Sequence, residues 1–308
     1  MSATPHPGPF SGIWPALLSP LADDGRLDAP SFAAHAQALL EAGCGGLTPF
    51  GTTGEFASFS VAERRAGVEA LLAAGVPAHR LMVSTSATAL TDVEELTRHA
   101  LAIGAHGCLM MPPFYFKGVG DAGVLAAYRQ LIDRVADDRL RLYLYHIPQL
   151  SGVGVSGGVI ATLKREYPQV ILGVKDSQCE RAHSVALAEA FMREVRIYVG
   201  NELDLPELGR RGSTGAISGV ANFMPRTVHA LVSQPDAADT PGRLARVDRL
   251  LSGLGGLSLI PALKAVQAAL SGHAGWLRLR APLLPLDGAQ ARSVALLARE
   301  IGLDPMRD

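Results

Sequence analysis

Short apolar runs alternate with longer stretches of helical periodicity along most of the chain. The runs are rich in Val, Ile, Leu and Tyr, as buried parallel strands are. They comprise residues 12–20, 45–51, 80–87, 107–113, 140–148, 170–176, 195–201 and 215–219. Between them, apolar residues recur at three- and four-residue spacings, which predicts amphipathic helices within 29–43, 60–75, 91–105, 121–138, 156–168 and 181–194. Ser60 and Glu63 have the spacing of a capping box at the start of one of these helices.

Eight candidate strands alternating with helices predict an α/β fold, a (β/α)8 TIM barrel with additional C-terminal helices. We expect the barrel, as the catalytic domain, to occupy residues 1–230. Residues 231–308 are expected to form a C-terminal helical extension, because helical periodicity continues there. A doubly wound open sheet is the alternative architecture, but no GxGxxG motif follows the first strand to support it.

Composition narrows the classes of function. The 308 residues are 48% hydrophobic, carry a formal net charge of −1 and show no basic run, which argues against a nucleic-acid or anionic-membrane partner. The three cysteines are scattered, so neither a disulfide framework nor a zinc site is expected. The first twelve residues lack the features of a signal peptide, and no apolar run reaches the roughly 18 residues that a membrane span needs. The expectation is a soluble cytoplasmic protein.

A lysine at the end of an apolar run is the first candidate for chemistry. Barrel active sites lie at the C-terminal ends of the strands, and the run at 170–176 ends in Lys175 and Asp176. Burial disfavours the ammonium form of lysine, and a neutral amine can attack a carbonyl carbon to form a Schiff base. A lysine on a strand-end loop with its amine in water is the simpler alternative.

Two other strand ends supply hydroxyl groups. Tyr145 lies near the end of the run at 140–148, and Thr52 and Thr53 lie between glycines that allow close approach of a ligand to the backbone. Such hydroxyls can relay a proton without placing a formal charge in a pocket. A tight turn around the two threonines and a core tyrosine are the structural alternatives.

Five motifs together resemble the dihydrodipicolinate synthase and N-acetylneuraminate lyase family. They are GTTGE at 51–55, PPFYF at 112–116, YHIP at 145–148, GVKD at 173–176 and GAISGVAN at 215–222. They occur in the family's order and at its spacings over about the whole chain. The resemblance implies a pyruvate-dependent class I aldolase or lyase on a (β/α)8 barrel. It also implies no metal or organic cofactor, and a homotetramer built as a dimer of dimers.

The resemblance implies roles for individual residues. Lys175 would carry the Schiff base with pyruvate or with a 2-oxo acid substrate, and Tyr145 would be the general acid/base beside it. Thr52 and Thr53 match the hydroxyl pair that relays protons and holds the pyruvate carboxylate. Tyr115 matches the tyrosine that the family inserts into the active site of the neighbouring subunit.

Further positions bear on substrate binding. Ile217 matches a position whose carbonyl faces the bound pyruvate. Gly200 and Glu202 fall where sialic acid lyases hold sugar hydroxyls, and Ser218 is a further hydroxyl near the pocket; for Glu202, a purely structural role remains open. The second acidic position of those lyases is Leu203 here, which favours a 2-oxo-3-deoxy sugar acid shorter than sialic acid.

One position separates two activities within the family. Dihydrodipicolinate synthases typically carry an arginine two residues after the proline of the tyrosine motif, where it binds the carboxylate of the aldehyde substrate. Leu150 occupies that position here and cannot pair with a carboxylate, and the segment IPQLSGV at 147–153 resembles sugar-acid aldolases instead.

The leading hypothesis is therefore an aldolase that cleaves a 2-oxo-3-deoxy sugar acid into pyruvate and an aldehyde, or catalyses the reverse condensation. One alternative is 4-hydroxy-tetrahydrodipicolinate (dihydrodipicolinate) synthase, which condenses pyruvate with aspartate semialdehyde. A dehydratase using the same Schiff-base chemistry is another. A non-catalytic barrel that binds 2-oxo acids is the alternative from a different class of protein.

Several polar residues near these motifs are expected to have structural roles. His146 should point away from Tyr145 in an extended strand and pack. Glu55 is expected to be a hydrogen-bond partner, Arg64 to lie on a solvated helix face, and Cys179 to be a core residue at a helix start.

Overall fold

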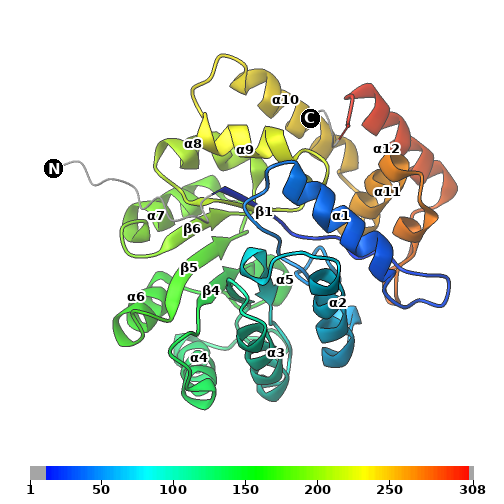
Figure 1. The fold of residues 1–308 in the computed structure, drawn as a ribbon. Coiled ribbons are helices and arrows are strands. Elements are labelled where there is room, and N and C mark those ends of the chain that lie inside the picture. The colour runs from blue at the N-terminus through cyan, green and yellow to red at the C-terminus, as the bar shows by residue number, and fades with distance from the viewer. Residues whose placement is uncertain (1–11, 305–308) are drawn as a thin grey trace.

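The computed structural model describes residues 12–304, and within them seven strands form one parallel sheet. The strands are β1 (Gly12–Pro15), β2 (Met82–Ser84), β3 (Gly107–Met110), β4 (Leu142–His146), β5 (Ile171–Asp176), β6 (Arg196–Val199) and β7 (Gly215–Ser218). Their order is β1-β7-β6-β5-β4-β3-β2. Figure 1 shows the strands in the middle of the molecule with helices around the outside. The predicted barrel architecture is confirmed.

The expected strand at 45–51 is reduced to two isolated bridges, one to the residue after β1 and one to the residue before β2. Leu47 and Thr48 nevertheless continue the hydrogen-bond ladder of the sheet. Thr48 N donates to Pro15 O at the end of β1 (2.9 Å), and Met82 N donates to Leu47 O (2.9 Å). Pro49 follows directly and has no N–H to continue the pairing. This short segment takes the eighth position and closes the sheet between β1 and β2.

Six helices follow the strands where the periodicity predicts them, and three shorter ones, at 148–151, 205–210 and 225–233, were not predicted. The barrel helices are α1 (Ala29–Glu41), α2 (Val61–Ala73), α3 (Leu90–Ala102), α4 (Asp121–Val135), α5 (Pro148–Ser151), α6 (Gly157–Glu166), α7 (Arg181–Phe191), α8 (Leu205–Arg210) and α9 (Pro225–Ser233). Short 3-10 turns η1 (Phe56–Ser58), η2 (Ala78–Arg80), η3 (Glu202–Asp204) and η4 (Val220–Asn222) lie between them. The capping box of Ser60 and Glu63 is confirmed at the start of α2.

The C-terminal helices are α10 (Thr240–Leu254), α11 (Leu259–Ser271) and α12 (Gly288–Glu300), with η5 (Ala274–Leu277) between the last two. Figure 1 shows α11 and α12 on one side of the barrel, with α1 lying next to α11. This arrangement brings the first and the eleventh helix together although they are far apart in the sequence.

The core is apolar on both faces of the sheet, as a parallel sheet covered by helices requires. Every residue of β4 is buried, and large side chains such as Trp14, Tyr143 and Tyr198 are almost fully enclosed. Tyr143 Oη lies 2.8 Å from His106 Nε2, just before β3, and accepts from Arg196 Nη1 of β6 (2.9 Å), so this buried hydroxyl has a partner on each side of β4.

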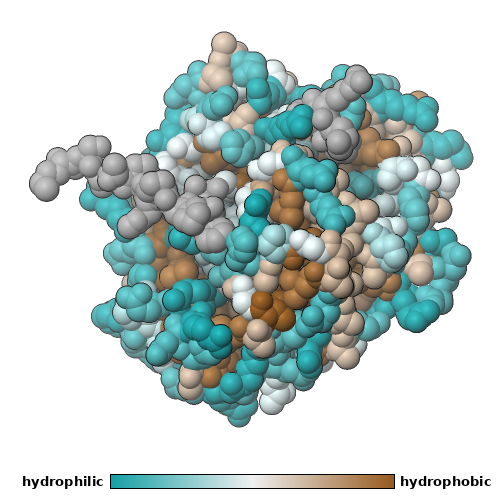
Figure 2. Space-filling view, viewed as in Figure 1, coloured by the Kyte–Doolittle hydropathy of each residue, from teal (hydrophilic) through white to brown (hydrophobic). Residues whose placement is uncertain are grey.

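The surface drawn in Figure 2 has apolar residues towards its middle, whereas the outer helices present mostly hydrophilic side chains. In the described part of the chain, the helices taken singly are too short or too polar to cross a membrane. One sharply bent pair, Thr240–Leu254 with Leu259–Ser271, passes that test on length and composition.

Candidate active site

Strand register brings the lysine and the tyrosine together. Tyr145 of β4 lies opposite Lys175 of β5, and His146 lies opposite Asp176. Because successive side chains point to opposite faces of a sheet, Tyr145 and Lys175 share one face while His146 and Asp176 share the other. Two functional groups are thereby held side by side by backbone pairing alone.

Lys175, Tyr145 and Thr52 form a continuous set of contacts. Lys175 is 5% exposed, and its Nζ lies 4.2 Å from the centroid of the Tyr145 ring. Tyr145 Oη lies 3.3 Å from Thr52 Oγ1, across a gap of 93 residues in the sequence. An amine, a phenol and an alcohol in such proximity can bind a carbonyl compound covalently and move protons beside it.

The loop carrying Thr52 and Thr53 is anchored to the C-terminal helices. Glu55 has a left-handed φ of 58° and accepts a hydrogen bond of 2.6 Å from Lys264 Nζ of α11. The two side chains are 0% and 1% exposed. Burial lowers the pKa of Lys264, and the neighbouring Glu55 carboxylate acts in the opposite direction. The rigid placement of the threonines thus depends in part on a buried ion pair.

Lys264 was not among the predicted site residues, although the sequence offered a signal for it. It stands alone within the apolar stretch of α11, where a charged side chain needs a buried partner. Glu55 was expected to be a structural hydrogen-bond partner, and the structure places it in that position. The pairing itself joins residues 209 apart in the sequence, so no local pattern could identify it.

Glu202 and Ser218 form a second polar pair in the barrel. Glu202 Oε1 accepts a hydrogen bond of 2.5 Å from Ser218 Oγ and one of 3.3 Å from Val220 N. Burial raises the pKa of Glu202, while these hydrogen bonds and the charge of Lys175 act in the opposite direction. The carboxyl group of Glu202 therefore holds a proton more readily than that of an exposed glutamate.

The remaining predicted residues line the same end of the barrel. A Cβ at Gly200 would lie 2.1 Å from Ser177 Oγ, so only glycine fits where β6 ends against β5. Ile217 of β7 is 1% exposed. Thr53 Oγ1 would lie 3.6 Å from a Cβ at Gly219, which places Thr53 against the end of β7.

Tyr115 and Leu150 lie apart from this buried group. Tyr115 is 72% exposed and its ring contacts Phe116, while Leu150 of α5 is 57% exposed. Lys117 Nζ donates to Ser151 O (2.8 Å) and ties the loop bearing Tyr115 to α5. Within a single chain, Tyr115 is therefore exposed to solvent. The apolar side chain of Leu150 lies at the position where an arginine would bind the carboxylate of an aldehyde substrate.

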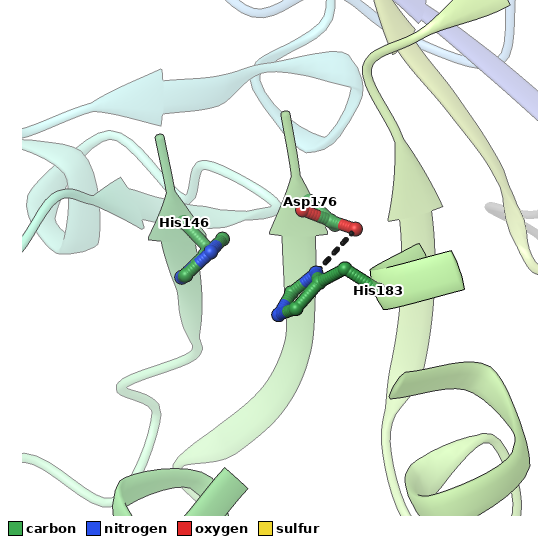
Figure 3. A group of neighbouring side chains, drawn as sticks. All are labelled: His146, Asp176 and His183. Atoms are coloured by element: carbon green, nitrogen blue, oxygen red, sulfur yellow. Dashed lines mark hydrogen bonds and ion pairs between the residues drawn. The ribbon is translucent and has the colours of Figure 1, made fainter. Parts of the chain in front are cut away.

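On the opposite face of β4 and β5, His146, Asp176 and His183 come together, as Figure 3 shows. The rings of His146 and His183 stack with centroids 4.6 Å apart. Asp176 Oδ2 lies 3.1 Å from His183 Nδ1 and accepts a bond of 2.6 Å from Ser184 Oγ of α7. His146 points away from Tyr145, as its place in the strand predicts.

These three residues have ligand atoms within 4.8 Å of one another, close enough to hold a metal ion. Their hydrogen bonds favour a structural role. Val155 N donates to His146 Nδ1 (2.9 Å), so the ring proton belongs on Nε2, which lies 2.6 Å from Gln178 Oε1. Both nitrogens of His146 are therefore committed to neighbours, and metal binding would break one of these bonds.

Two expectations about single residues are wrong. Arg64 is 3% exposed, because its guanidinium donates to Ser84 O (2.6 Å) at the end of β2 and to Ser86 O (2.8 Å) just beyond it, and burial lowers its pKa to about 10. Cys179 is exposed and has a left-handed φ of 64°, so it belongs to a turn before α7. Helical periodicity does not show which distant groups the long Arg64 side chain contacts. The position of Cys179 in the sequence does not show that its backbone forms a turn.

The family model described as the dihydrodipicolinate synthetase family matches residues 9–300. An uncharacterised DapA-like lyase of Chloroflexus aurantiacus is 32% identical over 292 residues, which are 92% of this chain and 94% of the relative. The crystal structure of dihydrodipicolinate synthase from Agrobacterium tumefaciens is 31% identical with a TM-score of 0.88, covering 94% of this chain and 99% of that one. A prophage protein of the same family from E. coli K12, solved in complex with pyruvate, is 25% identical with a TM-score of 0.86, covering 96% and 99%.

Proposed function

Because the chain belongs to the dihydrodipicolinate synthetase family, we propose that Lys175 forms a Schiff base with pyruvate or a related 2-oxo acid. The chain is a carbon–carbon lyase of the class I aldolase type. The observation that carries the proposal is the position of Lys175 Nζ over the Tyr145 ring at 4.2 Å, with Tyr145 Oη 3.3 Å from Thr52 Oγ1.

The chemistry follows from these contacts. The Lys175 amine attacks C2 of the 2-oxo acid, water leaves, and an iminium forms that can accept an electron pair. Tyr145 removes the proton of the C4 hydroxyl, assisted by Thr52. The C3–C4 bond then breaks, its electrons become the enamine, and the C4 fragment leaves as an aldehyde. Protonation of the enamine at C3 and hydrolysis of the iminium release pyruvate and restore the lysine.

For the substrate, we propose a 2-oxo-3-deoxy sugar acid. Leu150 places an apolar, 57% exposed side chain where a guanidinium would be needed to bind a second carboxylate. Glu202 and Ser218 offer a carboxyl group and a hydroxyl to the polyol end of a substrate held on Lys175, and the pair is already joined by a bond of 2.5 Å. Thr53, Gly200 and Ile217 form the wall beside the 2-oxo acid.

A second candidate is the condensation of pyruvate with aspartate semialdehyde. It is favoured by the 31% identity to the dihydrodipicolinate synthase of Agrobacterium tumefaciens over 94% of this chain. It requires another cation to take the place of the arginine that Leu150 replaces.

Steady-state rates on both substrate classes test the proposal. We expect the enzyme to release pyruvate from a six- or five-carbon 2-oxo-3-deoxy sugar acid. The kcat/KM of this cleavage should be at least about 100-fold above that of the condensation with aspartate semialdehyde, because an unpaired substrate carboxylate lowers kcat/KM by about this factor. Leu150→Arg should shift the ratio towards aspartate semialdehyde, and Leu150→Met should leave it unchanged. Efficient condensation by the wild-type enzyme would establish the second candidate, and pyruvate binding without turnover of either class would point to a non-catalytic barrel.

A further inference from the structure

A cavity of about 380 Å³ lies between α1 and α11, away from Lys175. Its volume falls within the roughly 300–1,000 Å³ of small-molecule sites. Its walls are mostly apolar and come from α1, α11 and η5, and they include Ala38, Leu39, Leu270 and Trp276. Three polar side chains at its inner end, His35, Asn222 and Gln267, belong to one hydrogen-bond network.

Asn222 fixes the direction of the hydrogen bonds in this network. Its Nδ2 donates to Ala16 O and Gly219 O, both at 2.9 Å, so its Oδ1 is the acceptor for Leu18 N (3.3 Å) and for His35 Nε2 (2.9 Å). Burial lowers the pKa of His35 to about 4 and keeps the ring neutral. With its one proton on Nε2, His35 can only accept at Nδ1.

Gln267 is the next member of the network. Its Nε2 lies 3.3 Å from His35 Nδ1 and must donate there, because that nitrogen carries no proton. Its other amide atom, Oε1, is then left as an acceptor. Gln267 is 6% exposed, and no group in residues 12–304 donates to this buried oxygen. A buried acceptor in this state has lost its hydration without regaining a hydrogen bond.

We propose that this cavity is a second binding site, for a small apolar molecule that carries one N–H or O–H donor. The donor would bond to Gln267 Oε1, and the apolar body would lie along the alanine and leucine side chains with Trp276 at its edge. Among the described lining residues none is lysine or arginine and Asp304 is acidic, so the site disfavours anions. The ligand class therefore differs from the 2-oxo acids proposed for Lys175.

The network places this site next to the catalytic loops without making it part of them. Asn222 holds Gly219, which packs against Thr53, and α11 also carries Lys264, the partner of Glu55. An occupant would contact the same helix that anchors the threonine loop. Binding itself does not depend on the reaction proposed for Lys175, so it can be tested without substrate.

Indole and 1-methylindole are a matched pair of probes, because they share a shape and only indole has an N–H. We expect indole to bind the full chain in calorimetric titration, and 1-methylindole to bind at least about fivefold more weakly, as the loss of a donor to a buried acceptor predicts. Gln267→Met should remove the difference between the two probes. Ala38→Phe, which fills the cavity from the partly exposed side of α1, should abolish binding of both.

Gln37→Met is the control, since Gln37 lies on α1 outside the cavity and bonds to Ala74 O; it should bind both probes as the wild type does. Equal affinity of the two probes for the wild-type protein would overturn the proposal. So would indole binding that survives Ala38→Phe, or no binding up to the solubility limit of indole.

Discussion

The position of Lys175 in the sheet determines which side chains surround it. It lies on a buried strand next to Tyr145, and its amine faces an aromatic ring whose hydroxyl is turned to Thr52. Rigid backbone pairing fixes the lysine and the tyrosine, so little has to reorganise when a substrate binds. The two most reactive groups of the proposed site are thus placed by the fold itself.

Among single-residue substitutions, removal of the Tyr145 hydroxyl is the most specific test of the proposed proton relay. Tyr145→Phe keeps the ring beneath Lys175 and removes Oη, so we expect kcat to fall by about 10²–10⁴ with the fold intact. Thr52→Val should also lower kcat, and Thr52→Ser, which keeps a hydroxyl, should lower it much less. Steady-state kinetics on the best sugar acid measures all three, and an undiminished kcat for Tyr145→Phe would remove the tyrosine from the proton relay.

His35 makes stability depend on pH. Its pKa is lowered from 6.5 to about 4 by burial, so the unfolded chain binds the proton more readily than the folded one. Its contribution to stability is therefore complete above about pH 6.5 and is lost as the pH falls to about 4, by roughly 3 kcal/mol in total.

Urea unfolding of the wild type and of His35→Gln across this pH range isolates the effect, because all other titrating groups are shared. The free energy of unfolding of the wild type should fall relative to that of the variant as the pH decreases. Parallel pH profiles would show that His35 can be protonated in the folded state without cost.

Among the elements, α11 joins the C-terminal helices to the catalytic loop through Lys264 and Glu55. Lys264→Met leaves the Glu55 carboxylate buried without its partner and should cost about 3–5 kcal/mol in denaturant unfolding. The double variant with Glu55→Leu should recover most of this loss, because no buried charge remains. Arg65→Met, which breaks an exposed pair with Glu95, should cost less than about 1 kcal/mol. An equal loss of unfolding free energy in Lys264→Met and in the double variant would show that the unpaired Glu55 carboxylate is not what destabilises the single variant.

Sequence patterns predicted the elements well where the hydrophobic periodicity was long, as in α1–α4. The segment around Leu47 was predicted as a full strand because it is apolar, but Pro49 limits its pairing to two bridges. The proximity of Lys175, Tyr145 and Thr52 could be predicted because each lies at or near the C-terminal end of a predicted strand, and the strand ends of a barrel converge. The pairing of Glu55 with Lys264 and the network around Asn222 could not be predicted, because both depend on helix α11, which packs from the far end of the chain.

At the scale of the whole molecule, Tyr115 points to an assembly. A tyrosine that is 72% exposed beside an equally exposed Phe116 at 71% is an apolar surface suited to burial by another subunit. We propose that Tyr115 enters the active site of a neighbouring copy in a homotetramer built as a dimer of dimers.

Subunit complementation tests this arrangement. Tyr115→Ala and Lys175→Ala should each be nearly inactive alone. Mixed in equal amounts, dissociated and reassembled, they should recover roughly a quarter of the wild-type activity, because about half of the dimers are hybrids and half of the sites in each hybrid have both residues intact. Activity no higher than that of the separate variants would place Tyr115 outside the neighbouring site.

Covalent trapping shows whether Lys175 is the nucleophile. The protein is incubated with pyruvate, reduced with borohydride, digested and mapped by peptide mass spectrometry, with Lys175→Ala and the buried Lys264 as references. We expect a single pyruvate adduct, on Lys175, that is absent from Lys175→Ala. An unmodified Lys175 in folded protein, or an adduct on Lys264 or another lysine, would contradict it.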